Sequence, residues 1–221
     1  MISKEALVAA LHEGAYRATA EYYDYSKTFL TKCAGESYMV ACMAQDIRRT
    51  STVPFLCLEY CNSTFTKDLK EKFRGPKGDF QRGSGRIDMA ILNRDRQLKF
   101  AIEAKCNAAW NDTYRPDIER LLWLRNKLRR NETQYDLIAS IFIALVSSSS
   151  KISSEKAQER LAGKAKTWTG NITACLDENG AENYFFSEGD NIFSGIEYYK
   201  EKQNNLSKVY TVSTSLCCII E

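Results

Sequence analysis

The chain has 221 residues, of which 44% are hydrophobic and 27% are charged. This length favours a single domain, and the apolar share is large enough for a sizeable core, which excludes a mainly disordered chain. No apolar stretch approaches the ~20 residues that a membrane span needs, so we expect no membrane partner. The net charge of +3 neither requires nor excludes nucleic acid, so the positions of the charges must decide.

The chain has eight cysteines and a single histidine, His12. A zinc site needs closely spaced Cys and His ligands, and no two cysteines form a Cys-x-x-Cys pair. Several cysteines lie inside apolar runs such as FLCLEYC and TSLCCII, and no signal peptide is recognisable. We therefore expect reduced core cysteines in a cytoplasmic protein rather than a disulfide framework.

The first half of the chain alternates helical and extended patterns. Apolar residues at helical spacing predict a helix over 2–22 and a second helix over 35–49. Residues 52–61 are β-rich and predict a strand. A polar, glycine-rich connection follows over 66–86, and a connection this long inside a compact domain is usually functional or disordered.

The second half begins with two strands, 86–92 and 98–106, which are close enough in sequence to form a hairpin. A helix is expected from Pro116, at the first helical position, to about Arg130. The continuous apolar run 137–146 predicts a buried central strand. A helix over 153–166 and a last strand over 208–220 complete the pattern.

Residues 167–207 do not favour one element type. The order of the remaining elements predicts an α/β protein with a mixed central β-sheet flanked by helices. We expect one domain over 1–221, with a core over about 30–165. An N-terminal helix (1–25) and a C-terminal extension (167–221) would be added to that core.

The hairpin places charged side chains on one face. Pairing Leu92 with Lys99 puts Ala90 opposite Ala101 and therefore Asp88 opposite Glu103, with Cβ atoms roughly 4.5–5.5 Å apart. Lys105 lies two residues beyond Glu103 and points the same way. The opposite face of the hairpin is apolar, consisting of Ile87, Met89, Ile91, Phe100, Ile102 and Ala104.

Two opposed carboxylates repel each other unless a cation lies between them, and Mg²⁺ commonly takes one or two carboxylates with water and phosphate oxygens. An ammonium group beside the metal could orient a water or stabilise charge at phosphorus. Another interpretation of the same three residues is a solvated charge cluster on an exposed sheet face. A second acidic-x-Lys triplet, Asp68-Leu69-Lys70, lies in the polar connection and carries no weight.

Three features favour the metal interpretation. Glu36 lies four, seven and eleven residues before Val40, Met43 and Ile47, so it shares their inward stripe, although a first-turn Glu can also serve the helix dipole. The strand LKFAIEAKC embeds two charges in an apolar run, which a buried strand avoids unless the charges are paired or metal-bound. Basic residues also concentrate beside the hairpin.

That basic charge lies in two segments. Residues 66–86 and 115–130 each carry a net charge of +4, which leaves about −5 for the rest of the chain. A phosphate-binding surface would have such a distribution, although an ordinary solvated loop and helix would too. The expected nucleic-acid-binding residues are Lys70, Lys72, Arg74, Lys77, Arg82, Arg86 and Arg120.

The sequences RIDMAI (86–91) and FAIEAK (100–105) resemble the PD-(D/E)xK signature of the restriction-endonuclease-like nuclease superfamily. The resemblance covers roughly residues 30–165, and Ile87 stands where the family name has proline. It implies that Asp88, Glu103 and the Ala104 carbonyl bind a catalytic Mg²⁺ or Mn²⁺. It also implies that Lys105 assists the attacking water and that Glu36 holds a metal or water.

The function expected from this resemblance is a metal-dependent DNA endonuclease, of a restriction type or associated with a phage or mobile element. Many enzymes that cut both strands are homodimers, so a homodimer is the assembly we consider. The alternative is a non-catalytic nucleic-acid-binding or regulatory subunit on the same fold. In an unrelated α/β protein, Asp88→Ala would change little beyond surface charge.

Overall fold

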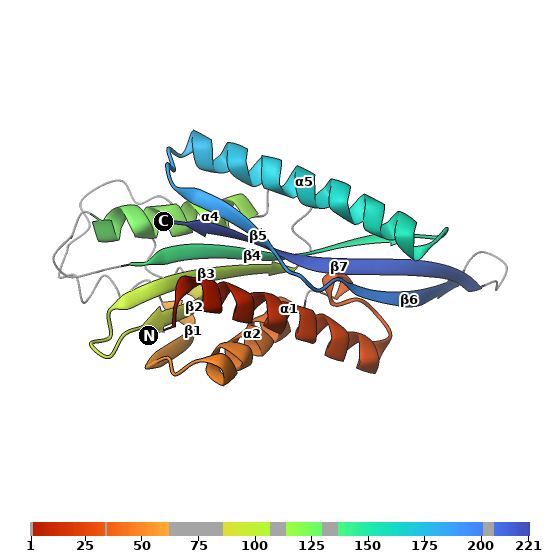
Figure 1. The fold of residues 1–221 in the computed structure, drawn as a ribbon, viewed down its shortest axis with the longest axis horizontal. Helices are drawn as coiled ribbons and strands as arrows, with labels where there is room; N and C mark the ends of the chain where they lie inside the picture. Colours follow the sequence, from red (N-terminus) through yellow and green to blue (C-terminus); the bar gives the residue numbers. More distant parts are fainter. Residues whose placement is uncertain (1, 34, 62–85, 107–113, 130–136, 201–205) are drawn as a thin grey trace.

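A computed structural model describes residues 2–33, 35–61, 86–106, 114–129, 137–200 and 206–221. It has a mixed β-sheet with helices on both faces, which confirms the predicted α/β class (Figure 1). The helices are α1 (Lys4–Ser26), η1 (Leu30–Lys32), α2 (Glu36–Thr50), α4 (Arg115–Arg129) and α5 (Ser154–Glu178). The strands are β1 (Phe55–Cys61), β2 (Arg86–Leu92), β3 (Leu98–Cys106), β4 (Ala139–Ser150), β5 (Tyr184–Glu188), β6 (Phe193–Lys200) and β7 (Leu206–Ile220).

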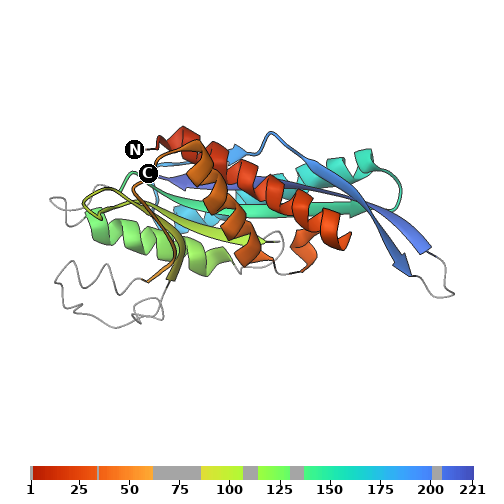
Figure 2. The same ribbon diagram turned by 90° about the horizontal axis from the view of Figure 1, so that it is seen from below.

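The sheet has the order β1-β2-β3-β4-β7-β5, and β6 pairs with the first half of β7. β3 and β4 run parallel, with α4 between them in sequence, and the other described pairs are antiparallel. β6 and the start of β7 form a ribbon that reaches past the end of α1 (Figure 2). Residues 167–221 thus supply the second half of α5 and three strands of the same sheet.

Two apolar layers hold the helices on the sheet. α1 and α2 lie on one face, over side chains such as Met89, Phe100 and Ile141. α4 and α5 lie on the other face, where Trp168 stacks on Phe142 and Phe186 packs edge-on against Trp168. The inner side of α4 consists of five buried apolar residues: Ile118, Leu121, Leu122, Leu124 and Leu128.

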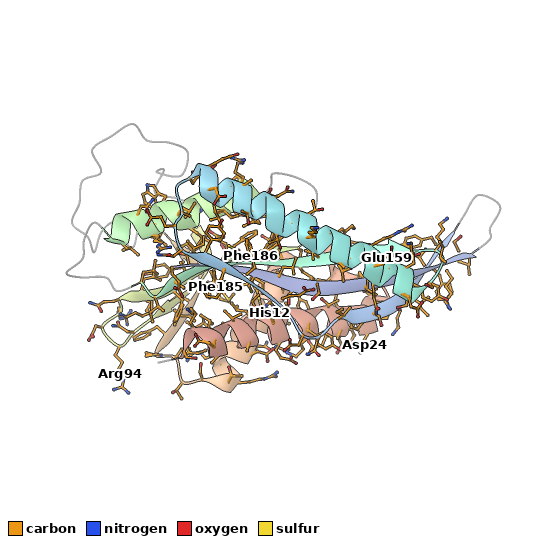
Figure 3. All side chains as sticks on the ribbon, turned by 45° about the horizontal axis from the view of Figure 1, so that its top comes forward. His12, Asp24, Arg94, Glu159, Phe185 and Phe186 are labelled. Atoms are coloured by element: carbon orange, nitrogen blue, oxygen red, sulfur yellow. The ribbon has the colours of Figure 1, made fainter. Side chains whose placement is uncertain are left out.

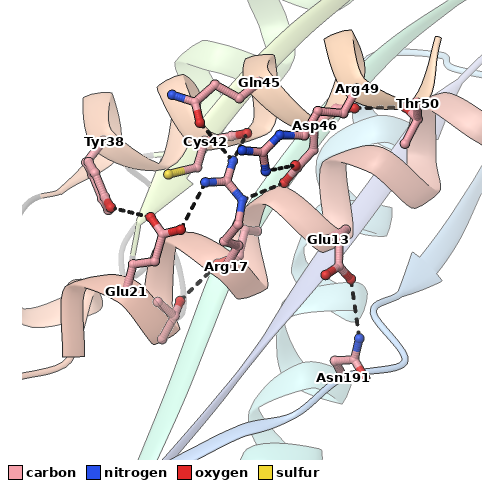
Figure 4. Close-up of polar contacts among 12 residues, drawn as sticks. Glu13, Arg17, Glu21, Tyr38, Cys42, Gln45, Asp46, Arg49, Thr50 and Asn191 are labelled. Carbon is pink, nitrogen blue, oxygen red and sulfur yellow. Dashed lines mark hydrogen bonds and ion pairs between the residues drawn. The ribbon is translucent and has the colours of Figure 1, made fainter. Parts of the chain in front are cut away.

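α1 and α2 are joined by polar contacts as well as by packing (Figure 4). The Arg17 guanidinium lies between Glu21 and Asp46, with N–O distances of 3.1 and 3.0 Å, and donates to the Cys42 carbonyl. At Gly14 the two helices approach so closely that an added Cβ would lie 2.4 Å from the Met43 Cα.

We expect Gly14→Ala to lower the free energy of unfolding by about 1–3 kcal/mol, because the helices must separate to admit the methyl group. Gly170→Ala is the matched control. Gly170 lies in α5 with no atom within 4 Å of an added Cβ, so the change should stabilise by about 0.5–1 kcal/mol. Urea denaturation of both variants measures the two effects, and an unaffected Gly14→Ala variant would contradict the described helix contact.

Several predicted details were wrong. Leu92 pairs with Leu98 rather than Lys99, because the Asn93–Gln97 turn closes earlier and leaves Lys99 as a β-bulge. Ile87 packs on the α4–α5 face rather than with Met89 and Ile91, and in the facing strand β1 Glu59 has a φ of 51°. α4 begins at Arg115, one residue before Pro116. α5 continues twelve residues beyond the predicted end at Lys166.

The aromatic residues of the region without a predicted element divide into two groups. Trp168 is buried, and Phe193 packs against Tyr23 and Phe29. Phe185, which Figure 3 labels beside Phe186, is 40% exposed, as is Tyr199, and Tyr198 is more exposed.

Four of the described cysteines are buried, as predicted for core residues, whereas Cys33 is exposed. No described helix is both long enough and apolar enough to cross a membrane.

Candidate metal centre

The hairpin of β2 and β3 brings Asp88 and Glu103 together. The register has Ala90 opposite Ala101, as predicted, and Met89 opposite Ile102. Asp88 and Glu103 are the next residue of each strand, and their side chains share a hydrogen bond. The Asp88 carboxylate accepts a hydrogen bond from the Ala104 N–H, with a distance of 2.8 Å. Because the N–H and C=O of one strand residue point to the same edge, the Ala104 carbonyl is directed toward Asp88 as well.

Glu103 is almost completely buried, with 2% of its surface exposed. It lies on the sheet face that α4 covers, and its carboxylate receives a short ion pair from Arg120 of that helix. Arg120 also donates to the Arg86 carbonyl, with a distance of 3.2 Å. This burial contradicts the interpretation of the charged residues as a solvated cluster.

Lys105 links the two layers of helices. Its ammonium lies 3.2 Å from Asp117 of α4 and 3.6 Å from Glu36 of α2. Asp117 is itself buried and forms a second ion pair with Arg120, at 3.3 Å. The ends of four elements therefore meet here, namely the start of β2, the end of β3 and the N-termini of α2 and α4.

The cluster has more acid than base. It contains four carboxyl groups (Glu36, Asp88, Glu103 and Asp117) and two cations (Lys105 and Arg120), so its formal charge is −4 + 2 = −2 when all are ionised. Glu36 is the first residue of α2, and Asp117 is in the first turn of α4. The positive ends of two helix dipoles thus point at this acidic centre and reduce the electrostatic free energy of holding the carboxylates together.

Protons partly compensate the excess charge. Burial raises the pKa of Glu103 to about 9, and the nearby Asp88 carboxylate adds to this effect against the opposing Arg120. Burial likewise raises the pKa of Asp88 and of Glu36 above their usual values. Near neutral pH Glu103 therefore keeps its proton in the metal-free protein and shares a hydrogen bond with Asp88.

Lys105 stays protonated in this environment. Burial alone would lower its pKa, but the carboxylates of Asp117 and Glu36 outweigh burial and raise the pKa of Lys105 above its ordinary value. Burial would also lower the pKa of Arg120, but its interactions with Glu103, Asp117 and Asp88 outweigh burial and raise it. Both side chains are therefore cations at neutral pH, and neither can serve as a general base in this state.

The cluster offers oxygen ligands of the kind that a small cation such as Mg²⁺ prefers. Asp88, Glu103 and the Ala104 carbonyl provide hard oxygen ligands, and Mg²⁺ usually completes its shell with water and substrate oxygens. Within the described ranges, no three Asp, Glu, His or Cys side chains approach closely enough to hold a metal by themselves. A metal here would therefore depend on two carboxylates, the carbonyl and water, and it would displace the Glu103 proton.

The structure brings the predicted residues Asp88, Glu103, Lys105 and Glu36 into one cluster. Of the residues predicted to bind nucleic acid, Arg86 is exposed near Glu59, and Arg120 forms an ion pair with Glu103. Lys70, Lys72, Arg74, Lys77 and Arg82 lie outside the described residues.

Sequence reasoning missed two members of this cluster. The sequence predicts no role in the site for Asp117 and only a phosphate-binding role for Arg120. A signal for Asp117 was present, because Leu121, Leu124 and Leu128 follow it at offsets of four, seven and eleven. Glu36 has the same spacing to the inward apolar residues of its own helix.

No family model, curated protein or solved structure shows significant similarity to this chain.

Proposed function

We propose that the chain is a metal-dependent nuclease that hydrolyses phosphodiester bonds in DNA, with its centre at Asp88, Glu103 and Lys105. The observation that carries the proposal is a largely buried cluster of four carboxyl groups around two cations, one of them a protonated lysine. A divalent cation would balance the charge of the carboxylates that are left without a cation or a proton. The resemblance of segments 86–91 and 100–105 to the PD-(D/E)xK signature agrees with the same chemistry.

Bound Mg²⁺ or Mn²⁺ would polarise a phosphoryl oxygen and lower the pKa of a bound water. In the net reaction a water oxygen bonds to phosphorus, one bridging P–O bond breaks, and a proton passes to the leaving alcohol. Asp88 and Glu103 would hold the metal, with the Ala104 carbonyl as a further ligand, and Glu36 would hold a metal-bound water.

Lys105 would act as a cation rather than as a base. Its ammonium can orient the attacking water or stabilise the negative charge that grows on the phosphoryl oxygens. Asp117 would position Lys105 by the 3.2 Å ion pair. Arg120, which contacts Glu103, would bind a phosphate oxygen of the substrate, the role predicted for it from the sequence.

A cleavage assay on supercoiled plasmid tests the proposal. We expect the wild type to nick or cut the plasmid with Mg²⁺ or Mn²⁺ and to be inactive in EDTA. Asp88→Ala should reduce cutting by about 1000-fold or more, because it removes a metal ligand. Asp95→Ala, in the exposed turn between β2 and β3, is the control and should retain full activity. Equal activity of Asp88→Ala and Asp95→Ala would refute the proposal.

The alternative function is a non-catalytic DNA-binding or regulatory module. The contact between Arg120 and Glu103 favours it, because a guanidinium already lies beside the most buried carboxyl group, where a metal would have to bind. Under this alternative, the folded wild type binds DNA but cuts neither duplex nor single strands with any metal. A homodimer, a restriction-type role and a cytoplasmic location remain part of the nuclease proposal.

A further inference from the structure

A groove of about 720 Å³ lies between the first half of α1 and the strand β5 with the turn that follows it. Figure 3 labels His12 on the α1 side and Phe185 on the β5 side. Thr50, the last residue of α2, also lines the groove, whereas Glu36, the first residue of α2, belongs to the metal centre. These two residues are roughly 21 Å apart along the helix axis, at about 1.5 Å per residue. The groove is therefore separate from the metal centre and does not depend on the proposed function.

Apolar residues line the groove on both sides. Ala6, Ala9 and Ala10 contribute from α1, and their small side chains leave space between the helix and the strand. Phe185, which is 40% exposed, contributes from β5. Pockets for small molecules are mostly apolar and have volumes of roughly 300–1,000 Å³. The groove is therefore of the right size and kind to cover the apolar body of a small ligand.

The charges of the lining are mostly negative. Four lining residues are acidic and one is a lysine: Glu5, Glu13, Glu188, Asp190 and Lys4. Glu5 lies in the first turn of α1, where a carboxylate stabilises the helix dipole, so three acids remain that the helix start does not explain. This excess of acid runs against the net charge of +3 on the chain. A cleft lined by charges of one sign concentrates ions of the opposite sign.

Lys4 shows how an ammonium group is held at this groove. Its Nζ lies over the Phe185 ring, 4.7 Å from the ring centroid, and forms an ion pair with Glu221. An ammonium over an aromatic face is stabilised by the negative charge of the ring, and a nearby carboxylate adds to this. Glu221 does not line the groove, so the ion pair of Lys4 leaves the lining acids in excess.

His12 adds no positive charge to the groove at neutral pH. Its Nδ1 lies 2.7 Å from the Ser215 hydroxyl, and its Nε2 lies 3.1 Å from the Ser187 hydroxyl. Burial lowers the pKa of His12 to about 4, although the Asp190 carboxylate opposes this effect. Gly189 lets the turn after β5 approach the ring, because an added Cβ there would lie 3.2 Å from Nδ1. The imidazole is therefore a fixed, neutral part of the wall.

We propose that this groove binds a small organic cation, namely an amine with an apolar body. The apolar body would pack against Phe185 and the alanines of α1, and the ammonium would lie among Glu13, Glu188 and Asp190. Asn191 donates to the Glu13 carboxylate at 3.4 Å, which is long for a hydrogen bond, so this neutral contact leaves the carboxylate able to bind an ammonium (Figure 4). The same acids would repel a phosphate, which excludes DNA as the ligand of this groove.

The test uses proton NMR, because His12 is the single histidine of the chain and its Cε1 proton reports on the groove. Phenylpropylammonium, added at neutral pH, should shift this signal in a saturable manner. Phenylpropionate has the same apolar body and the opposite charge. It should bind at least about tenfold more weakly, because the lining acids repel it.

Two variants separate the charges of the groove from its shape. Glu13→Gln/Asp190→Asn should weaken binding of the amine by about tenfold, since both walls lose a carboxylate. Ala9→Leu should also weaken binding, because the larger side chain narrows the groove and leaves the charges unchanged. Asp24→Asn/Glu159→Gln is the matched control, since it removes two exposed carboxylates outside the groove (Figure 3).

No saturable shift with the amine, or equal affinity for the amine and the acid, would overturn the inference. So would wild-type affinity in the folded Glu13→Gln/Asp190→Asn variant, and so would an equal loss in the control, which would show a general charge effect. Circular dichroism checks that each variant is folded. Asp88→Ala should bind the amine as the wild type does, so failure of the nuclease proposal and failure of this inference are distinguishable.

Discussion

Replacing Lys105 by Gln should lower the rate of DNA cleavage by about 100- to 1000-fold and leave metal binding intact. The ammonium supplies electrostatic stabilisation in the transition state, and loss of one such donor has an effect of this size. The substitution also removes a positive charge from beside Glu36 and Asp117, which changes the formal charge of the cluster from −2 to −3. Metal affinity should therefore stay equal or increase.

Single-turnover cleavage and a separate metal titration measure these two effects. Arg94→Gln is the control, since Arg94 lies in the turn between β2 and β3 and is exposed (Figure 3). If Lys105→Gln lost metal affinity and activity together, Lys105 would be a structural support of the site rather than a catalytic group. An unchanged cleavage rate would remove Lys105 from the mechanism.

Glu103→Gln should abolish metal-dependent cleavage and yet stabilise the metal-free protein by about 1–4 kcal/mol at about pH 8. The pKa of Glu103 in the folded protein, about 9, is above its ordinary value of 4.5. The folded state therefore binds more protons than the unfolded state between these values, and stability falls as pH rises through that window. Gln cannot lose a proton, and its amide can donate to Asp88 and accept from Arg120.

Thermal denaturation over a pH series in EDTA tests this prediction. The difference in Tm between Glu103→Gln and the wild type should widen from about pH 5 to about pH 9, and Mg²⁺ should raise the Tm of the wild type alone. A Tm difference that does not change with pH would show that Glu103 is ionised in the metal-free protein. Glu119→Gln, on the same helix as Arg120 but outside the cluster, is the control.

Much of the hairpin could be predicted from the sequence, because alternation of polar and apolar residues fixes which side chains share a face. Asp88, Glu103 and Lys105 come together for this reason, and Glu36 joins them because its helical stripe points inward. These are local patterns with a fixed period. The predicted partner of Leu92 was wrong because Lys99 is a bulged residue. The bulge shifts the strand pairing by one residue, and the alternation of polar and apolar side chains does not reveal it.

The contributions of α4 and α5 were harder to predict. Arg120 reaches Glu103 only because the connection from β3 to β4 lays α4 across the sheet, and no sequence spacing reports that contact. The end of α5 was missed because Gly170 interrupts a Thr-rich stretch, although Trp168, Ile172 and Cys175 bury this part of the helix. Tertiary packing here outweighs weak helix propensity.

Mn²⁺ binding measured by electron paramagnetic resonance tests the central claim most directly, because it requires neither the right substrate nor a partner. Mn²⁺ has the oxygen preference of Mg²⁺, and its free signal falls as it binds. We predict one site on the wild type and on Asp95→Ala, with affinity that rises with pH as the Glu103 proton is released. Asp88→Ala should lose this site. Equal Mn²⁺ binding by Asp88→Ala and the wild type, or no binding by the folded wild type at any pH, would contradict the metal centre.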